Sequence, residues 1–424
     1  MANARKLAAA ALVRMEKQSA YSNLTVTGML GGAELSPTDK AFVSALIYGV
    51  LDRKLTLQYV LSAHMKTPFC KVSPYTAAVL QSALYQILYM DKVPASAAVN
   101  EAVKLVKCSK ESRNAAFVNA VLRSILREGA ALPTDDSVFS LSVRYSCPQD
   151  VIQSFLADYG LENTKAILEE SLRPAPITLR VNTLKTTAEE LASAFAQRGI
   201  GTEPGGIENA LSLTQGIDIA ADPFYRDGLF HVQDTSSQTA VSVLAPQPGE
   251  RVLDLCAAPG GKSFTMAQWM QNKGELWACD LYENRIRLIE DGAKRLDLSI
   301  IKTAVNDAAL YHDEWPSFDR VLCDVPCSGL GVLRRKPEIK YKPLSDSAAL
   351  PEIQYAILQN AAKYLRPGGK LLYSTCTLRR AENEETAARF SNEHPVFRKM
   401  YEHTFLPHMD KTDGFYCALF QKEG

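Results

Sequence analysis

The fold is decided by one short stretch, VLDLCAAPGGK at residues 252–262. Its first four residues form an apolar run that is typical of a buried strand. Small residues and two glycines follow, and a helical pattern begins near Ser263. In a doubly wound sheet, ligands bind beyond the carboxyl ends of the strands, where the N-terminus of the next helix offers free N–H groups. The stretch therefore predicts a strand, a ligand-binding loop at residues 256–262 and a helix.

The carboxylate of Asp280 indicates which kind of ligand the loop holds. Asp280 ends the next apolar strand, 19 residues beyond Gly261, and a carboxylate at that place suits a ribose diol. A phosphate-binding P-loop requires glycine where Cys256 stands, and the G-x-G-x-x-G pattern of dinucleotide sites is absent. We therefore expect a nucleoside-type cofactor. The alternative interpretation is an ordinary tight turn between a strand and a helix.

Strands and helices alternate around this stretch. Apolar strand patterns, with helical segments between most of them, occupy residues 251–255, 276–279, 300–305, 320–323 and 370–374. Such alternation predicts a parallel, doubly wound α/β sheet of the Rossmann-like type.

Two further domains are expected before this sheet. Helical periodicity with few Gly or Pro residues marks 39–61, 75–90 and 97–106, and 148–172 looks like two short helices. Alternating and β-branched residues predict a strand at 177–181. Beyond it the sequence predicts a helix at 187–197 and short strands at 211–213 and 229–232. We therefore expect a multidomain chain, with an all-α domain at residues 1–130, a small α+β domain at 140–235 and the doubly wound domain at 236–424.

Charge is distributed unevenly along a chain whose net charge is zero. Residues 1–130 hold 16 Lys+Arg and 8 Asp+Glu, a net charge of +8, which the remaining residues balance with −8. A basic module favours a polyanion as its partner. The uncharged stretch 72–90 is interrupted by Pro74, Gln81 and Gln86, and its apolar residues fall at helical spacing. This pattern indicates a buried helix, and we expect a cytoplasmic protein with no membrane segment.

The nine cysteines are scattered, and no CxxC pair is present. This argues against a disulfide framework and a zinc site, and because the six histidines show no ligand spacing, we expect no metal. Two cysteines differ from the rest. Cys327 in DVPCSG (324–329) and Cys376 in STCT (374–377) each follow a predicted strand. Both therefore fall at the edge of the sheet where the cofactor loop also ends.

A thiol at this edge has a chemical use beside a methyl donor. C5 of cytosine is a poor nucleophile, but addition of a thiolate at C6 makes an enamine whose C5 attacks a methyl group. Loss of the C5 proton then expels the thiol. The attacking cysteine needs appreciable thiolate character. Asp324 is placed to hydrogen-bond the N3/N4 edge of the base or to donate a proton there.

The strings DLCAAPGGK (254–262), DVPCSGLG (324–331) and STCT (374–377) resemble motifs of the Nop2/Sun family of RNA 5-methylcytosine methyltransferases. The resemblance implies S-adenosylmethionine as the cofactor, Cys376 as the covalent nucleophile and Cys327 as the residue for product release. It also implies that the cofactor contacts come from Cys256, Ala257, Ala258, Pro259, Gly260, Gly261, Lys262, Asp280, Arg285, Asp307 and Asp324.

The resemblance extends over nearly the whole chain. Segments at 39–49, 93–103 and 117–123 look like a NusB-type helical RNA-binding domain, in agreement with the basic charge of this region. A NusB-like domain fused to a methyltransferase is similar to the bacterial Sun/Fmu branch of the family. This implies C5 of a cytosine in 16S ribosomal RNA, in the small subunit, as the substrate. Cys147 departs from the family pattern, which usually has His after Arg-Tyr-Ser.

We expect the protein to be a monomer.

A basic strip in the loop after Cys327 predicts contact with RNA. It combines cations for phosphate contacts with one aromatic ring for stacking. The alternative interpretation is a solvated loop. The members of the strip are Arg334, Arg335, Lys336, Lys340, Tyr341 and Lys342.

Other functions stay open at this point. A transfer RNA cytosine-C5 methyltransferase has the same chemistry. A NusB-like RNA-binding regulator with a silent methyltransferase half is a second alternative, but the intact Cys327, Cys376, Lys262 and Asp324 argue against it. A DNA cytosine methyltransferase attacks with the Pro-Cys cysteine and has no need of Cys376. A P-loop ATPase is disfavoured by Cys256.

Overall fold

The computed structural model describes residues 4–18, 28–29 and 35–424. Contacts divide the chain into two compact units. The first unit comprises residues 1–173 and 333–342, and the second comprises residues 174–332 and 343–424. Within the described ranges, no helix is long and apolar enough to cross a lipid bilayer.

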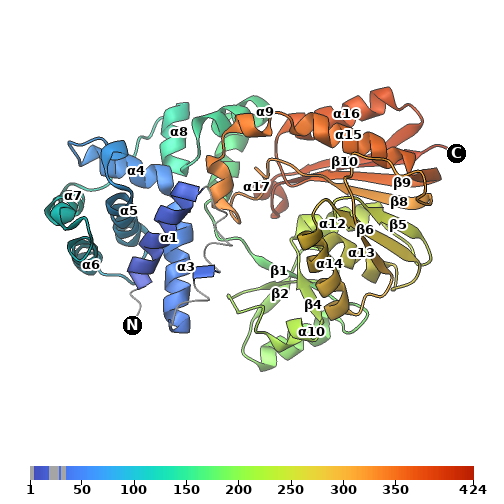
Figure 1. The fold of residues 1–424 in the computed structure, drawn as a ribbon, viewed down its shortest axis with the longest axis horizontal. Helices are drawn as coiled ribbons and strands as arrows, with labels where there is room; N and C mark the ends of the chain where they lie inside the picture. Colours follow the sequence, from blue (N-terminus) through green and yellow to red (C-terminus); the bar gives the residue numbers. More distant parts are fainter. Residues whose placement is uncertain (1–3, 19–27, 30–34) are drawn as a thin grey trace. The chain divides into compact units, whose positions relative to one another are not determined.

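The first unit is helical, as predicted (Figure 1). Gly49 shows how closely its helices pack, because a Cβ atom there would lie 2.0 Å from the ring of Tyr85. The predicted run 39–61 is two helices, since Arg53 has non-helical backbone angles. The expected pair of helices at 148–172 is confirmed, because α9 (Gln149–Glu170) consists of two helices that meet at a kink at Gly160, where φ is +72°. The helices are α1 (Ala4–Gln18), α3 (Pro37–Asp52), α4 (Lys54–Ala63), α5 (Pro74–Tyr89), α6 (Ala95–Lys107), α7 (Ala115–Glu128), α8 (Val138–Tyr145) and α9 (Gln149–Glu170).

The second unit begins with a small antiparallel sheet in the order β2-β3-β1-β4. It contains β1 (Ile177–Val181), β2 (Thr202–Pro204), β3 (Ala210–Leu213) and β4 (Phe230–Val232), with α10 (Ala188–Gln197) and α11 (Pro223–Arg226). Apolar residues of β1, β3, β4 and α10 form one core. The predicted strands are confirmed, while β2 was not predicted because three residues ending in a proline carry little strand signal.

The main sheet has seven strands in the order β10-β11-β9-β8-β5-β6-β7. The five predicted strands are confirmed and run parallel. A purely parallel sheet was wrong, because β11 pairs antiparallel with both β9 and β10. The short connection between β10 and β11 permits only antiparallel pairing. The strands are β5 (Arg251–Asp254), β6 (Glu275–Asp280), β7 (Ile301–Val305), β8 (Phe318–Asp324), β9 (Leu365–Thr375), β10 (Phe397–Phe405) and β11 (Phe415–Lys422).

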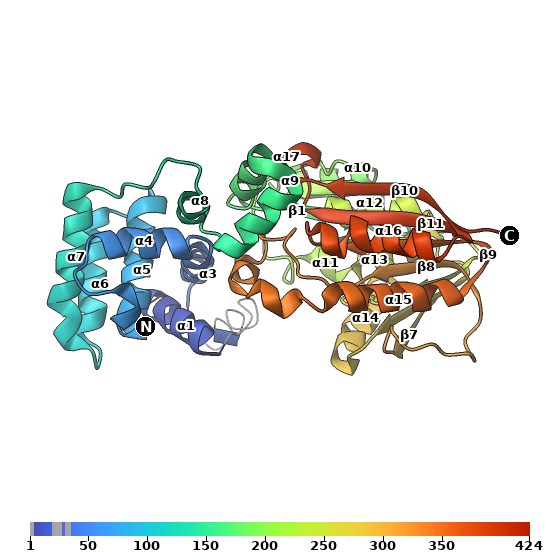
Figure 2. The same cartoon turned by 90° about the horizontal axis from the view of Figure 1, so that it is seen from above.

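Helices cover both faces of this sheet, as a doubly wound fold requires (Figure 1). One face packs against α12 (Thr235–Leu244), α13 (Gly261–Trp269) and α14 (Glu283–Leu296). The other face packs against α15 (Leu350–Lys363) and α16 (Glu384–Glu393), which run along the strands (Figure 2). The first strand, β5, lies between β6 and β8. The chain order reverses there, which is where ligands bind in such sheets.

Candidate active site

The loop at residues 256–262 makes a tight turn between β5 and α13. Gly260 precedes α13 with φ +110°, and a Cβ atom there would lie 2.4 Å from the ring of Phe264. Glycine is therefore needed at this position for both conformation and space. Ala257 N donates to Cys279 O (2.7 Å), which ties the loop to the neighbouring strand β6.

Asp280 at the end of β6 is joined to this loop. The residue is 3% exposed, and its carboxylate accepts a hydrogen bond from Ala258 N (3.3 Å). Arg285 pairs with Asp280 (3.2 Å) and donates to Ala258 O (2.9 Å). Asp307 is exposed just beyond β7, the strand that pairs with β6. The structure thus gathers the loop, Asp280 and Arg285 into one cluster and places Asp307 beyond the next strand.

Two buried polar atoms beside this cluster fit a nucleoside-type ligand. Asp254 Oδ1, at the end of β5, and Asn306 Nδ2, just after β7, have no hydrogen-bond partner among the described residues. Buried polar atoms normally have partners, so an acceptor and a donor left open around Asp280 fit a ligand with hydroxyl and amino groups. Burial raises the pKa of Asp254 to about 7, although Ser263 Oγ donates to its other oxygen (2.6 Å).

Lys262 and Asp324 connect the cofactor loop with the end of β8. Lys262 Nζ donates to Asp324 Oδ2 (2.7 Å), and Ser374 Oγ donates to Asp324 Oδ1 (2.8 Å). Burial lowers the pKa of Lys262, but the charge and hydrogen bond of Asp324 outweigh it, and Cys376 adds to this effect. The pKa of Lys262 is therefore raised, and a permanent cation lies beside the strand end that carries Cys376.

The two predicted cysteines are adjacent. Cys327 Sγ and Cys376 Sγ lie 3.2 Å apart, and both residues are partly exposed. Gly331 N donates to Cys376 O (3.0 Å), and Ser328 Oγ lies 2.7 Å from Thr377 Oγ1. The pKa of Cys327 is raised by its hydrogen bond with Cys376, by burial and by the charges of Cys376 and Glu382. The Cys327 thiol therefore holds its proton more firmly than a free cysteine does.

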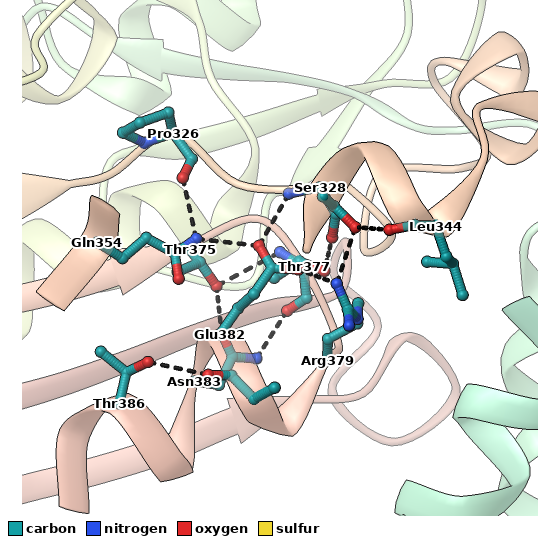
Figure 3. Close-up of polar contacts among 12 residues, drawn as sticks. Pro326, Ser328, Leu344, Gln354, Thr375, Thr377, Arg379, Glu382, Asn383 and Thr386 are labelled. Carbon is teal, nitrogen blue, oxygen red and sulfur yellow. Dashed lines mark hydrogen bonds and ion pairs between the residues drawn. The ribbon is translucent and has the colours of Figure 1, made fainter. Parts of the chain in front are cut away.

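Sequence reasoning missed the polar residues that hold these loops. Glu382, Asn383 and Gln354 are buried next to the segments that carry the cysteines (Figure 3). Glu and Asn in a polar helical segment usually form a solvated face, so nothing in the pattern marked them. One signal was available: Glu382 and Asn383 follow Cys376 within seven residues and thus stay near it.

The predicted basic strip is divided between internal contacts and the surface. Lys340 is 0% exposed, and its Nζ donates to Asp52 Oδ1 (2.6 Å). Tyr341 Oη donates to Leu51 O (2.8 Å), and Lys54 Nζ lies over its ring at 5.4 Å. We therefore withdraw Lys340 and Tyr341 as RNA contacts. Both belong to the helical unit, where they tie residues 333–342 to the end of α3.

The other members of the strip keep some exposure. Lys336 and Lys342 are exposed, and Arg334 and Arg335 are partly exposed. These four residues belong to the helical unit, whereas Cys327 belongs to the other unit.

Comparisons with known families match three parts of the chain. Residues 241–421 match the family described as 16S rRNA methyltransferase RsmB/F, and residues 2–127 match the NusB family. Residues 147–220 match the ferredoxin-like domain of RsmF/B-like methyltransferases. These matches agree with the helical unit, the small antiparallel sheet and the seven-stranded sheet.

Curated relatives match over nearly their full length. The probable ribosomal RNA small subunit methyltransferase B of Bacillus subtilis is 39% identical and covers 99% of both chains. The ribosomal RNA small subunit methyltransferase B of Vibrio cholerae is 33% identical over 92% of this chain and 91% of the relative. The crystal structure of PH0851 shares the fold over 100% of this chain and 99% of that one, with a TM-score of 0.83 at 24% identity. The chain therefore belongs to the RsmB family of 16S ribosomal RNA methyltransferases.

Proposed function

We propose that this enzyme transfers a methyl group from S-adenosylmethionine to C5 of a cytosine in 16S ribosomal RNA through a covalent bond between Cys376 and C6. The observation that carries the proposal is the pair of thiols 3.2 Å apart, one strand away from the ion pair of Lys262 and Asp324. Covalent attack on a pyrimidine ring requires a thiolate, which a nearby cation favours, and the second cysteine suits release of the product.

Cys376 starts the reaction. Its thiolate forms the Sγ–C6 bond, and the C5–C6 π electrons become available at C5. S-adenosylmethionine, when bound, supplies the electrophilic methyl group to which C5 bonds. Transfer of the C5 proton to a base, assisted by Cys327, frees the C5–H bonding pair. This pair re-forms the C5–C6 double bond as the Sγ–C6 bond breaks and its electrons return to the sulfur of Cys376. The products are 5-methylcytosine, S-adenosylhomocysteine, a proton and the free thiolate of Cys376. Asp324 hydrogen-bonds the N3/N4 edge of the base while charge develops there.

The cofactor is held by residues that already converge. The loop from Cys256 to Lys262 offers its backbone, and Asp280 with Arg285 closes one side of it. We assign the ribose of the cofactor to Asp280. We assign the other polar groups of its nucleoside to Asp254 and Asn306, because Asp254 Oδ1 and Asn306 Nδ2 are buried and lack partners among the described residues. Asp307 is assigned to the nucleoside from its place after β7.

RNA binding is assigned to the basic helical region. Its net charge of +8 over residues 1–130 and its match to the NusB family support contact with a polyanion. Lys336, Lys342, Arg334 and Arg335 remain proposed contacts, since their side chains keep some exposure. The functional division that we propose is residues 1–130, 140–235 and 236–424, in a monomeric, cytoplasmic enzyme. The target cytosine must be single-stranded or flipped out for Cys376 to reach C6.

A trapping experiment tests the chemistry. Wild type, Cys327→Ala and Cys376→Ala are incubated with 16S ribosomal RNA, or with small subunits, and radiolabelled S-adenosylmethionine, and then separated by denaturing electrophoresis. We expect labelled RNA covalently attached to the Cys327→Ala protein. We expect Cys376→Ala neither to trap nor to methylate.

The opposite pattern would overturn the assignment of the nucleophile. Trapping on Cys376→Ala would make Cys327 the attacking residue. Labelling of transfer RNA but not of 16S ribosomal RNA by the wild type would overturn the substrate while keeping the chemistry.

A further inference from the structure

A buried carboxylate holds the backbone next to Cys327. Glu382 is 0% exposed and lies in a short 3-10 helix (Arg380–Glu382) that begins after the Cys376 segment. Its Oε2 accepts hydrogen bonds from Ser328 N (2.9 Å) and Gln354 Nε2 (2.9 Å), and its Oε1 faces Arg379 (3.3 Å; Figure 3). Burying a charge is unfavourable unless it is paired and hydrogen-bonded, so this carboxylate is retained at a cost that these contacts offset.

Gln354 holds the backbone on the N-terminal side of Cys327. Its Nε2 also donates to Pro326 O (2.9 Å), which belongs to the peptide group before Cys327. Ser328 N belongs to the peptide group after Cys327. Tyr373 Oη in turn donates to Glu382 O (2.5 Å) and to Gln354 Oε1 (3.3 Å). Both peptide groups that flank Cys327 are therefore fixed by one connected network.

Asn383, the residue after Glu382, holds the segment that contains Cys376. Thr375 Oγ1 donates to its Oδ1 (2.5 Å), and its Nδ2 donates to Thr377 O (3.0 Å). These contacts lie on the two sides of Cys376. Two consecutive residues, Glu382 and Asn383, thus hold one cysteine loop each, in addition to the direct contacts between the loops.

We propose that Glu382 is a positioning residue for Cys327, whose carboxylate fixes the Pro326–Ser328 backbone so that the Cys327 thiol faces Cys376. This inference rests on the proposed function of the cysteine pair and adds a residue to it. Glu382 acts through Cys327 and not on the RNA.

The charge of Glu382 reinforces its geometric role. The titratable groups around Cys327 are Cys376, Glu382 and Tyr373, with Arg379 against Glu382. The carboxylate disfavours a second negative charge at Cys327 and helps to raise the pKa of that thiol. Lys262 lies on the other side, where it favours charge at Cys376. The two charges thus act on the two thiols in opposite directions.

Three variants of the full chain separate geometry from charge. Glu382→Asp keeps the charge but shortens the reach to Ser328 N. Glu382→Gln keeps the size but removes the charge. Glu385→Gln is the control, because Glu385 is exposed and lies in the first turn of α16, only three residues away. Each variant is made alone and together with Cys327→Ala. The rates of formation and decay of the covalent RNA adduct are measured for all of them.

We expect Glu382→Asp to slow adduct decay about tenfold or more, in line with the loss of one hydrogen bond to a charged group, while adduct formation changes less than about threefold. In the Cys327→Ala background the same change should have no further effect on decay, because a positioning residue acts only through its target. Glu385→Gln should match the wild type. Equal slowing of both steps, or slower decay without Cys327, would overturn the inference and leave Glu382 a general structural residue.

A second measurement needs neither RNA nor activity. In Cys376→Ala protein, the alkylation rate of Cys327 by iodoacetamide is followed against pH by peptide mass spectrometry. Adding Glu382→Gln should move the midpoint of this profile to lower pH, and Glu385→Gln should leave it unmoved. An unmoved midpoint for Glu382→Gln would overturn the inference that the charge of Glu382 raises the pKa of Cys327. Because this result does not depend on methylation, it stays informative if the wild type fails to methylate 16S ribosomal RNA.

Discussion

The loop after β8 and the loop after β9 each carry one cysteine, but their surroundings differ. The Cys376 segment lies near Lys262, whose ammonium group pairs with Asp324. The Cys327 segment is held by the carboxylate of Glu382. The two thiols are 3.2 Å apart, and Glu382, which acts on Cys327, and Lys262, which acts on Cys376, carry opposite charges.

This difference explains how two chemically identical side chains take unequal roles. A single proton shared between two neighbouring thiols has no preference if their environments match. A cation on one side and an anion on the other remove that symmetry, because each charge favours one of the two protonation states. The two charges therefore favour Cys376 over Cys327 as the thiolate, in line with its proposed role as the nucleophile.

The largest effect is expected for Lys262→Met. The change removes the cation beside Cys376 and leaves the partly buried Asp324 without its ion-pair partner (2.7 Å in the wild type). We expect the rate of adduct formation to fall on the order of 10²-fold, as for loss of one stabilising group in an active site. The pH midpoint for alkylation of Cys376 should also rise. Lys273→Met is the control, since Lys273 is exposed before β6. An unmoved alkylation profile would show that Lys262 does not activate Cys376.

How much of this site the sequence could predict depends on the kind of interaction. Cys327, Cys376 and Asp324 end parallel strands, and the fold brings such ends to one edge, so their meeting was predictable. Glu382 and Gln354 act through hydrogen bonds to backbone atoms of a distant loop, which no local pattern encodes. Lys340 was misjudged for the same reason, because a lysine in a basic run gives no sign that Asp52, far away in sequence, neutralises it in the interior. The β10–β11 hairpin was missed because a helix–strand alternation predicts only the parallel part of the sheet.

A smaller effect, on the pH dependence of stability, is expected at Asp254, which ends β5 next to β8. Burial raises its pKa to about 7, and the nearby charge of Asp324 adds to the shift. A carboxyl group whose pKa is raised in the folded state stabilises the fold at low pH, and this contribution is lost as the pH rises toward 7. Asp254→Asn mimics the neutral form and keeps an acceptor for Ser263 Oγ. Its free energy of unfolding should exceed that of the wild type above pH 7 by more than it does at pH 5.

Urea denaturation at the two pH values measures this difference for Asp254→Asn. Asp297→Asn serves as the control, because Asp297 is a largely exposed carboxylate just after α14. A constant difference between pH 5 and pH 8 would mean that Asp254 is ionised throughout. Lys262 would then face two carboxylates, those of Asp324 and Asp254, and the asymmetry between the two loops would be weaker than we infer.

The smallest effect is expected where the two loops touch directly. Ser328 Oγ and Thr377 Oγ1 lie 2.7 Å apart, and Thr377 is fully buried while Ser328 is not. Ser328→Ala leaves the buried hydroxyl of Thr377 without this partner and should cost about 1–3 kcal/mol in urea denaturation. Adding Thr377→Val removes the unpaired hydroxyl, so the double variant should recover part of the loss. Adduct formation and decay should change little in either variant, because Glu382 and Asn383 still hold the backbone of each loop. If Ser328→Ala instead slows decay as much as Glu382→Asp does, the direct contact between the hydroxyls, and not the buried carboxylate, sets the position of Cys327.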